Sequence, residues 1–321
     1  MSNLSVSVII CCYTEERLQD IREAVASVQR QTRLPEEIVL VVDNNRDLYE
    51  RLQSELSSKS TQVVLNVGPK GTSATRNGGI AAARGDLVAF LDDDATAVEN
   101  WLKCLVQPFE NPMAVAVGGR AVPLWPREKL PLWFPEEFDF VIGCTAHKKL
   151  ILEEDNQVRS VTGSNMCFRR EVFERVGGWN TKLGGIAGQT HDGGEEAELC
   201  LRIKRRMPTS LILHEDGAVV RHKVVPQRAT LKYMFTRCLR EGITRAKVRA
   251  FCSSISENAL AAENVYLRRL LVTSIAGRLR RAYSPAALAQ TGVIIANVLL
   301  VGVGYLIGLS RYRQSEDGLG P

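Results

Sequence analysis

The chain has 321 residues, a length that is enough for one large domain or two modest ones. Of these residues, 45% are hydrophobic and 24% are charged, which is typical of a globular protein. Its formal net charge is +5, and its basic residues are not confined to one stripe with aromatic residues between them, which argues against a nucleic-acid-binding protein. The eight cysteines include no CxxC pair, which argues against a zinc ribbon or a redox motif and favours a reducing compartment.

The N-terminal part of the chain alternates between two hydrophobic patterns, and no signal peptide is expected before it. Apolar, β-branched runs predict four buried strands, at residues 5–13, 36–45, 61–67 and 86–94. Apolar residues at helical spacing predict helices between them, at residues 17–32, 48–58 and 73–85. This alternation predicts an α/β, Rossmann-like fold whose mostly parallel sheet has helices on both faces.

Polar side chains stand at the carboxyl ends of these strands, where ligands of such sheets bind. They are Tyr13, Asp43 and the triplet Asp92, Asp93 and Asp94. A single aspartate would cap the helix expected over residues 95–109, but three adjacent carboxylates repel one another. The triplet therefore indicates a site for Mg²⁺ or Mn²⁺, which prefer oxygen ligands and share them with substrate phosphates.

The middle of the chain is predicted to be mixed. Strands are expected at residues 114–124 and at the start of 161–179, followed by helices from about Arg170 and over 195–206 and by a strand over 217–226. Residues 184–194 are glycine-rich, which is typical of a mobile lid, although a surface loop has the same composition. Within that segment, His191 could reach a phosphate or an acceptor.

The C-terminal part has a different character. Residues Ala286 to Leu309 are 24 residues without a charge, and a bilayer-spanning helix needs about 20. Glycines at 292, 302, 304 and 308 suit a membrane helix, and a buried core helix is the alternative. Residues 228–281 are basic and amphipathic, which predicts helices on an anionic membrane surface or, alternatively, helices packed on the preceding domain.

Five motifs occur together in a familiar order: "SVIICCYTEER", "EEIVLVVDNN", "GTSATRNGGIAAARGDLVAFLDDDA", "GSNMCFRREVFERVGGWN" and "GGEEAELCLRI". Together they resemble the family 2 glycosyltransferases, inverting enzymes of the GT-A fold, over roughly residues 5–225. Within the family, the chain is most similar to membrane-associated enzymes that act on polyprenyl- or dolichyl-phosphate-linked sugars. The resemblance implies a GT-A catalytic domain (1–226), and the composition of the remaining chain predicts basic membrane-proximal helices (227–284) and a transmembrane helix with a short tail (285–321).

The resemblance assigns the donor site residue by residue. It implies that Tyr13 stacks on the nucleobase and that Asp43, followed by Asn44 where the family often has a second aspartate, holds the base edge and ribose. Arg76 would pair with the diphosphate or base region. Asp93 would bind the ribose, and Asp92 would help to shape the turn.

The metal and the catalytic base are also implied by the resemblance. Asp94 would hold Mg²⁺ or Mn²⁺ between the two phosphates, with His222 as a further ligand. Without metal and diphosphate, the triplet is expected to be electrostatically strained. At the position of the catalytic base, members of the family commonly have the sequence Gly-Glu-Asp. This chain has Gly194 followed by Glu195 and Glu196. Glu196 would deprotonate the acceptor hydroxyl for a direct displacement, with Glu195 as the alternative base.

These assignments imply a nucleotide-diphospho sugar donor, with a UDP-sugar expected, and a saccharide or lipid-linked acceptor. The protein would sit at the cell membrane with its catalytic domain in the cytoplasm, and no nucleic-acid partner is expected. A different class remains open, namely a catalytically inactive nucleotide-sugar-binding protein on the same fold. A nucleotidyltransferase is a further alternative, but "CCYTEERLQD" lacks the glycine-rich loop such enzymes carry after the first strand.

Overall fold

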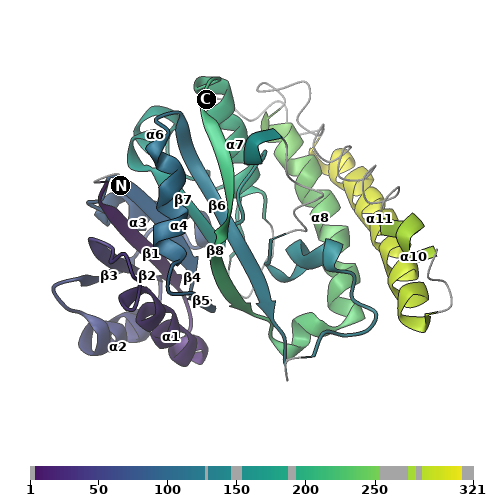
Figure 1. Cartoon of the computed structure of the whole chain (residues 1–321), viewed down its shortest axis with the longest axis horizontal. Helices are drawn as coiled ribbons and strands as arrows, with labels where there is room; N and C mark the ends of the chain where they lie inside the picture. The colour runs from purple at the N-terminus through teal and green to yellow at the C-terminus, as the bar shows by residue number, and fades with distance from the viewer. Residues whose placement is uncertain are drawn as a thin grey trace.

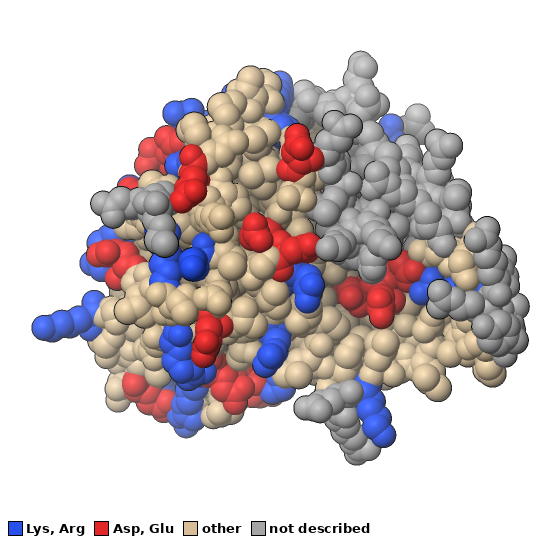
Figure 2. Space-filling model, viewed as in Figure 1, with Lys and Arg blue, Asp and Glu red and all other residues tan. Residues whose placement is uncertain are grey.

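The computed structural model describes residues 4–126, 129–145, 154–186, 193–252, 274–279 and 284–312. A central sheet with helices against it forms one body, and two long helices lie beside it at one edge of the molecule (Figure 1). On the face shown in Figure 2, acidic and basic side chains intermingle over the sheet-containing body.

Eight strands form one sheet in the order β3-β2-β1-β4-β7-β6-β8-β5. Their bounds are β1 Val6–Cys12, β2 Glu37–Asp43, β3 Thr61–Asn66, β4 Leu87–Asp92, β5 Ala95–Ala97, β6 Ala114–Leu124, β7 Asn165–Arg169 and β8 Leu211–Lys223. Strands β3, β2, β1 and β4 are mutually parallel, and β6 is parallel to β8. β7 is antiparallel to β4 and β6, and β5 is antiparallel to β8. The predicted, mostly parallel α/β sheet is confirmed.

The helices of the body match most of the predicted ranges. They are α1 Leu18–Gln29, α2 Arg46–Leu56, α3 Thr72–Ala82, α4 Trp101–Val106, α6 Arg170–Val176 and α7 Glu195–Arg206. Short 3-10 turns are η1 Glu15–Arg17, η2 Gln107–Glu110, η4 Glu136–Ile142, η5 Glu154–Asn156 and η6 Pro226–Ala229.

The helix predicted over residues 95–109 was wrong in its first half. Ala95–Ala97 instead form β5, because these residues find hydrogen-bonding partners in β8. The helix that follows, α4, is only six residues long, and Pro108 then stands in the first turn of the 3-10 helix η2. The strand expected over 217–226 also begins earlier, at Leu211.

Alternate residues of the strands face opposite layers of helices. On one face, Val8 and Ile10 pack in a cluster with Leu48 and Trp101 of α2 and α4. On the other face, Ile9 packs in a cluster with residues of α6 and α7. Burial on both faces explains why these strands are apolar at every position.

Two long helices follow the sheet. They are α8 Leu231–Cys252 and α11 Pro285–Tyr312, with the short helix α10 Ala276–Leu279 between them. A third apolar cluster joins Phe134 and Phe138 of the 129–145 segment to Met234 of α8 and Ile294 of α11. Among the described helices, α11 alone is long and apolar enough to cross a membrane. The core helix of a soluble protein can have the same length and composition.

One polar residue in α11 lacks a visible partner. Asn297 is fully buried, and neither its amide nitrogen nor its carbonyl oxygen has a hydrogen bond within the described part of the chain. Because an unsatisfied buried amide costs about 1–3 kcal/mol, we expect Asn297→Leu to raise the Tm by a few degrees in thermal unfolding. As a control, Thr291→Val should bring no such gain, because the Thr291 hydroxyl already donates to the Ala287 carbonyl at 2.8 Å. A lower Tm for Asn297→Leu would contradict the expectation.

Candidate active site

At the carboxyl end of β4, two aspartates and a histidine of β8 form a compact group that could hold a metal ion, called the metal-ligating group below. Single ligand atoms of Asp92, Asp94 and His222 all lie within 4.8 Å of one another. The His222 Nε2 atom is 3.3 Å from Asp94 Oδ1 and 3.5 Å from Asp92 Oδ2. Neighbouring ligands of an octahedral Mg²⁺ lie about 3 Å apart, so these side chains fit such an ion.

The pairing of β5 with β8 builds this group. Ala95 lies opposite His222 in the antiparallel register, so the residue directly after Asp94 fixes the imidazole beside it. β5, which forms where the first half of a helix was predicted, therefore brings His222 of β8 close to the triplet. Asp92, predicted to shape the turn, lies in this group together with the two predicted ligands.

Asp93 faces a residue that the sequence analysis missed. Arg17 Nη1 lies 2.6 Å from Asp93 Oδ1 and 3.1 Å from Asp94 Oδ2. The same guanidinium lies over the Tyr13 ring, 5.1 Å from its centroid. The repulsion expected within the triplet is thus offset by a cation supplied by the chain.

The charges in this group shift its proton affinities. Burial raises the pKa of Asp93 to about 7, against the opposing effect of Arg17. Burial disfavours the charged form of His222, but Asp94 and Asp92 outweigh it and raise the pKa of the imidazole. Since a metal ion binds neutral imidazole, a metal would compete with the proton of His222.

We expect Arg17→Met to lower the Tm in EDTA and to enlarge the rise in Tm that Mn²⁺ causes. The change leaves Asp93 and Asp94 without their guanidinium, and breaking a largely buried pair costs about 3–5 kcal/mol. An added cation then has more repulsion to relieve, so it stabilises the variant more. Thermal shift with EDTA and with Mn²⁺ measures both effects. Arg46→Met is the control, because its pair with Glu50 is solvent-exposed; equal Mn²⁺ shifts in the wild type and Arg17→Met would contradict this account.

The predicted nucleoside residues lie beyond this group, at the ends of β1 and β2. Asp43 Oδ1 accepts hydrogen bonds from Asn44 Nδ2 at 2.9 Å and Asn66 Nδ2 at 3.2 Å, and Oδ2 accepts one from the Gly71 backbone at 2.9 Å. Asn44 has a φ of 52°, a left-handed conformation that asparagine tolerates well. Asp43 is therefore fixed in place before any ligand arrives, and the Asn44 amide is what helps to hold it.

The predicted base residues begin α7 and share one arginine. Arg76 Nη1 donates to Glu195 Oε1 at 3.1 Å and to Glu196 Oε1 at 3.3 Å, and its Nη2 donates to the Gly163 carbonyl at 3.3 Å. The guanidinium stacks over Trp179, 4.9 Å from the ring centroid. A Cβ at Gly163 would overlap Glu196 Oε1, so the glycine of the "GSN" motif makes room for that carboxylate.

The two glutamates differ in environment. Burial raises the pKa of Glu195 to about 8, Glu196 adds to the rise, and Arg76 offsets only part of it. The Glu195 side chain is 7% exposed and that of Glu196 is 19% exposed, so Glu196 is the more accessible carboxylate. Burial opposes it, but His222 and then Arg76 lower the pKa of Asp92, so the guanidinium that Glu195 and Glu196 share also acts electrostatically on Asp92.

The glycine-rich segment is described only at its ends. Gly185 accepts a hydrogen bond at its carbonyl from the Thr72 backbone at 3.1 Å, which ties that end to the start of α3. Residues 187–192, with His191, lie outside the described residues, so the predicted lid stays a prediction.

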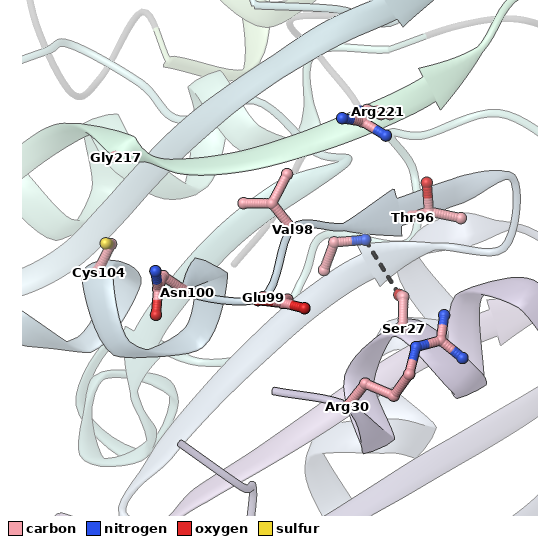
Figure 3. A pocket seen from close by; sticks show the side chains of 10 residues that line it. Ser27, Arg30, Thr96, Val98, Glu99, Asn100, Cys104, Gly217 and Arg221 are labelled. Atoms are coloured by element: carbon pink, nitrogen blue, oxygen red, sulfur yellow. Dashed lines mark hydrogen bonds between the residues drawn. The ribbon is translucent and has the colours of Figure 1, made fainter. Parts of the chain in front are cut away.

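A separate pocket of about 610 Å³ lies between α1, β5, α4 and β8 (Figure 3). Its lining includes Arg30, Glu99 and Arg221 but none of the predicted site residues. It therefore takes no part in the group built on Asp92, Asp94 and His222.

Residues 7–177 match the family model described as Glycosyl transferase family 2. The chain belongs to this family. It is 35% identical to a glucosyl-dolichyl phosphate glucuronosyltransferase of Haloferax volcanii, over 95% of this chain and 96% of the relative. This confirms the resemblance drawn from the five motifs.

Solved structures show the same fold in other glycosyltransferases. The mannosyltransferase PcManGT from Pyrobaculum calidifontis, in complex with GDP-Man and Mn²⁺, has a TM-score of 0.60 at 18% identity, covering 95% of this chain and 88% of that one. GalNAc-T7 with UDP, GalNAc and Mn²⁺ has a TM-score of 0.55 at 19% identity, covering 78% of this chain and 51% of that one. At these identities the likeness shows the GT-A fold, and the roles of single residues in this family 2 member stay predictions.

Proposed function

We propose that the protein is a metal-dependent, inverting glycosyltransferase that moves a sugar from a UDP-sugar to a hydroxyl of a lipid-linked saccharide. The observation that carries the proposal is the group of Asp92, Asp94 and His222 at the sheet edge, with Arg76, Glu195 and Glu196 beside it. An acidic cation site and a carboxylate base are the two things that this reaction needs from the protein.

The donor side of the site is built for a nucleotide diphosphate. Asp43 is held by two side-chain amides and a backbone N–H, so it can accept hydrogen bonds from the base or ribose in a fixed place. Tyr13 offers an aromatic face to the base. Asp94 and His222, with Asp92, would hold Mg²⁺ or Mn²⁺, which when bound neutralises the charge that develops on the leaving diphosphate.

The acceptor side is built around Glu196. This carboxylate accepts a hydrogen bond from Arg76 and is the more exposed of the pair, so it can take the proton of the attacking hydroxyl. Glu195 has a pKa of about 8 and is mostly protonated at neutral pH, which makes it the poorer base. Attack by one activated hydroxyl, without a covalent intermediate, inverts the anomeric configuration. We assign Arg76 the positioning of the base and an electrostatic share in stabilising the diphosphate.

The lipid-linked acceptor is inferred from the Haloferax volcanii relative, whose name specifies a glucosyl-dolichyl phosphate and a glucuronosyl group. That relative is matched over almost its whole length, so its tail has a counterpart here. The apolar helix α11 supports an association with the cell membrane. We place the catalytic domain on the cytoplasmic side, where nucleotide sugars and reduced thiols are found.

A transfer assay tests the proposal. Purified protein is given UDP- and GDP-sugars, with UDP-glucuronic acid among them, and a glucosyl polyprenyl phosphate acceptor, with Mn²⁺, Mg²⁺ or EDTA. We expect transfer from a UDP-sugar with either metal, none with EDTA, and a product of inverted anomeric configuration by NMR. Binding of nucleotide sugars without transfer to any acceptor would instead support an inactive binding protein.

A further inference from the structure

Helices α8 and α11 are packed so closely that their backbones touch. A Cβ at Gly242 would overlap the Val301 carbonyl, and one at Gly304 would overlap the Leu239 carbonyl. One turn further along both helices, Gly308 packs against Ala246. The residue numbers of the contacts increase together along both helices, so α8 and α11 run parallel and side by side (Figure 1).

α11 is also fixed to the catalytic domain near its start. Its Val293 and Ile294 lie in one apolar cluster with Phe138 and Met234, and Gln290 Nε2 donates to the Leu132 carbonyl at 3.1 Å. α8 in turn packs on the start of α7, where a Cβ at Gly194 would meet Val248 and Thr244. Among the described elements, α8 lies between α11 and the sheet (Figure 1).

The composition of α8 bears on how α11 can meet a membrane. Along its length α8 carries Lys232, Arg237, Arg240, Glu241, Arg245, Lys247 and Arg249. Glu241 is the one acidic residue among them, and it pairs with Arg237 and Arg245. A bilayer crossed by α11 would have to take in α8 as well, and charged side chains in hydrocarbon are strongly unfavourable.

The outward face of α11 is apolar along its length. Its exposed large residues are Leu288 (52%), Ile295 (47%), Leu299 (65%), Val303 (49%) and Leu306 (66%). Their spacing places them on one stripe of the helix, about 27 Å long at 1.5 Å per residue. Arg249, which donates to the Tyr305 hydroxyl at 2.6 Å, and Arg311 place positive charge near one end of it. An apolar stripe with basic neighbours is typical of a helix that lies in a membrane interface.

We propose that α11 lies in the plane of the membrane surface and does not cross it. The stripe from Leu288 to Leu306 is immersed at the boundary of headgroups and acyl chains, and Arg249 and Arg311 meet anionic headgroups. The charged helix α8 stays on the aqueous side, and both chain termini remain on the side of the catalytic domain. Because α8 touches Gly194, directly before Glu195, this placement also holds the proposed base close to the membrane surface.

Flotation with vesicles tests the stripe in the full-length protein. We expect wild-type protein to float with vesicles of mixed phosphatidylcholine and phosphatidylglycerol. The double variant Leu299→Asp/Leu306→Asp should lose at least tenfold in the bound-to-free ratio, because each change replaces apolar surface that is buried in the membrane by a charge. Leu34→Asp is the matched control, because Leu34 is equally exposed, at 66%, but precedes β2 and should leave flotation unchanged. Wild-type protein that does not float, or a double variant that floats like wild type, would overturn the proposal.

Topology separates an in-plane helix from a spanning one. Epitope tags are added to both ends of the full chain, and sealed membrane vesicles of known orientation are treated with protease. We expect both tags to be cut, or both to be protected, together with the catalytic domain. Tags on opposite sides would show that α11 spans the bilayer and would overturn the proposal. Neither experiment measures transfer, so an inactive protein could still confirm this placement.

Discussion

Replacing Asp94 by alanine is expected to abolish sugar transfer while the protein remains folded. Asp94 is almost fully buried and is one of three residues whose side chains could hold a metal ion, so alanine would remove one proposed ligand. A bound metal contributes several kcal/mol to stabilising transition-state charge. A loss of about 4 kcal/mol corresponds to a rate reduction on the order of 10³-fold.

The fold should survive because the partners of Asp94 keep other partners. Arg17 still pairs with Asp93 at 2.6 Å, and His222 still faces Asp92 at 3.5 Å. Circular dichroism and thermal unfolding check the fold, and kcat at saturating Mn²⁺ measures the effect. Asp47→Ala, an exposed acidic residue in the first turn of α2, controls for the loss of a charge. Substantial transfer by folded Asp94→Ala at high Mn²⁺ would reject this metal site.

The sheet and the edge that carries the site could be predicted from the sequence because both follow from local patterns. Apolar runs and helical spacing are properties of neighbouring residues, and parallel strands place their carboxyl ends together. Tyr13, Asp43 and Asp94 were therefore placed at one edge before any contact was known. The register confirms the neighbourhood, since Cys12 pairs with Val42 and Cys11 with Asp92.

The contacts within the site could not be predicted in the same way, because they join segments far apart in the chain. Asp94 meets His222 only through the pairing of β5 with β8, and local helical spacing over residues 95–109 concealed that pairing. Arg17 was missed for a similar reason, although it follows β1 within one helical turn of Tyr13. Arg17 is a polar residue in the segment that follows the carboxyl end of β1, and its position there is the signal that could have identified it.

The tail shows where composition ceases to determine structure. Its glycines and lack of charge predicted a helix of membrane type, and α11 is a helix over the predicted residues. Composition did not reveal that Gly304 and Gly308 pack against α8, because the matching Gly242 and Ala246 lie among charged residues. Whether α11 crosses a membrane or lies in its plane depends on its packing against the charged helix α8.

Replacing Glu196 by glutamine is expected to remove turnover while nucleotide affinity remains. The amide keeps the shape of the side chain and can still accept a hydrogen bond from Arg76, but it cannot take the acceptor proton. A positioned general base contributes typically about 10²–10⁴-fold, so kcat should fall by that factor. Thermal shift or calorimetry with UDP and Mn²⁺ should show an unchanged affinity. Glu196→Asp is the conservative control and should retain part of the activity, because it keeps the carboxylate and shortens it by one methylene.

Glu195→Gln separates the two glutamates. Because the pKa of Glu195 is raised from 4.5 to about 8, the folded protein holds this proton more tightly than the unfolded chain does. Its contribution to stability is therefore lost as the pH rises through that window, and Glu195→Gln should lose less stability than wild type between pH 5 and pH 8. The same variant should keep most of its turnover. If Glu195→Gln is inactive and Glu196→Gln is active, the proton is taken by Glu195, and the base lies one residue earlier in α7.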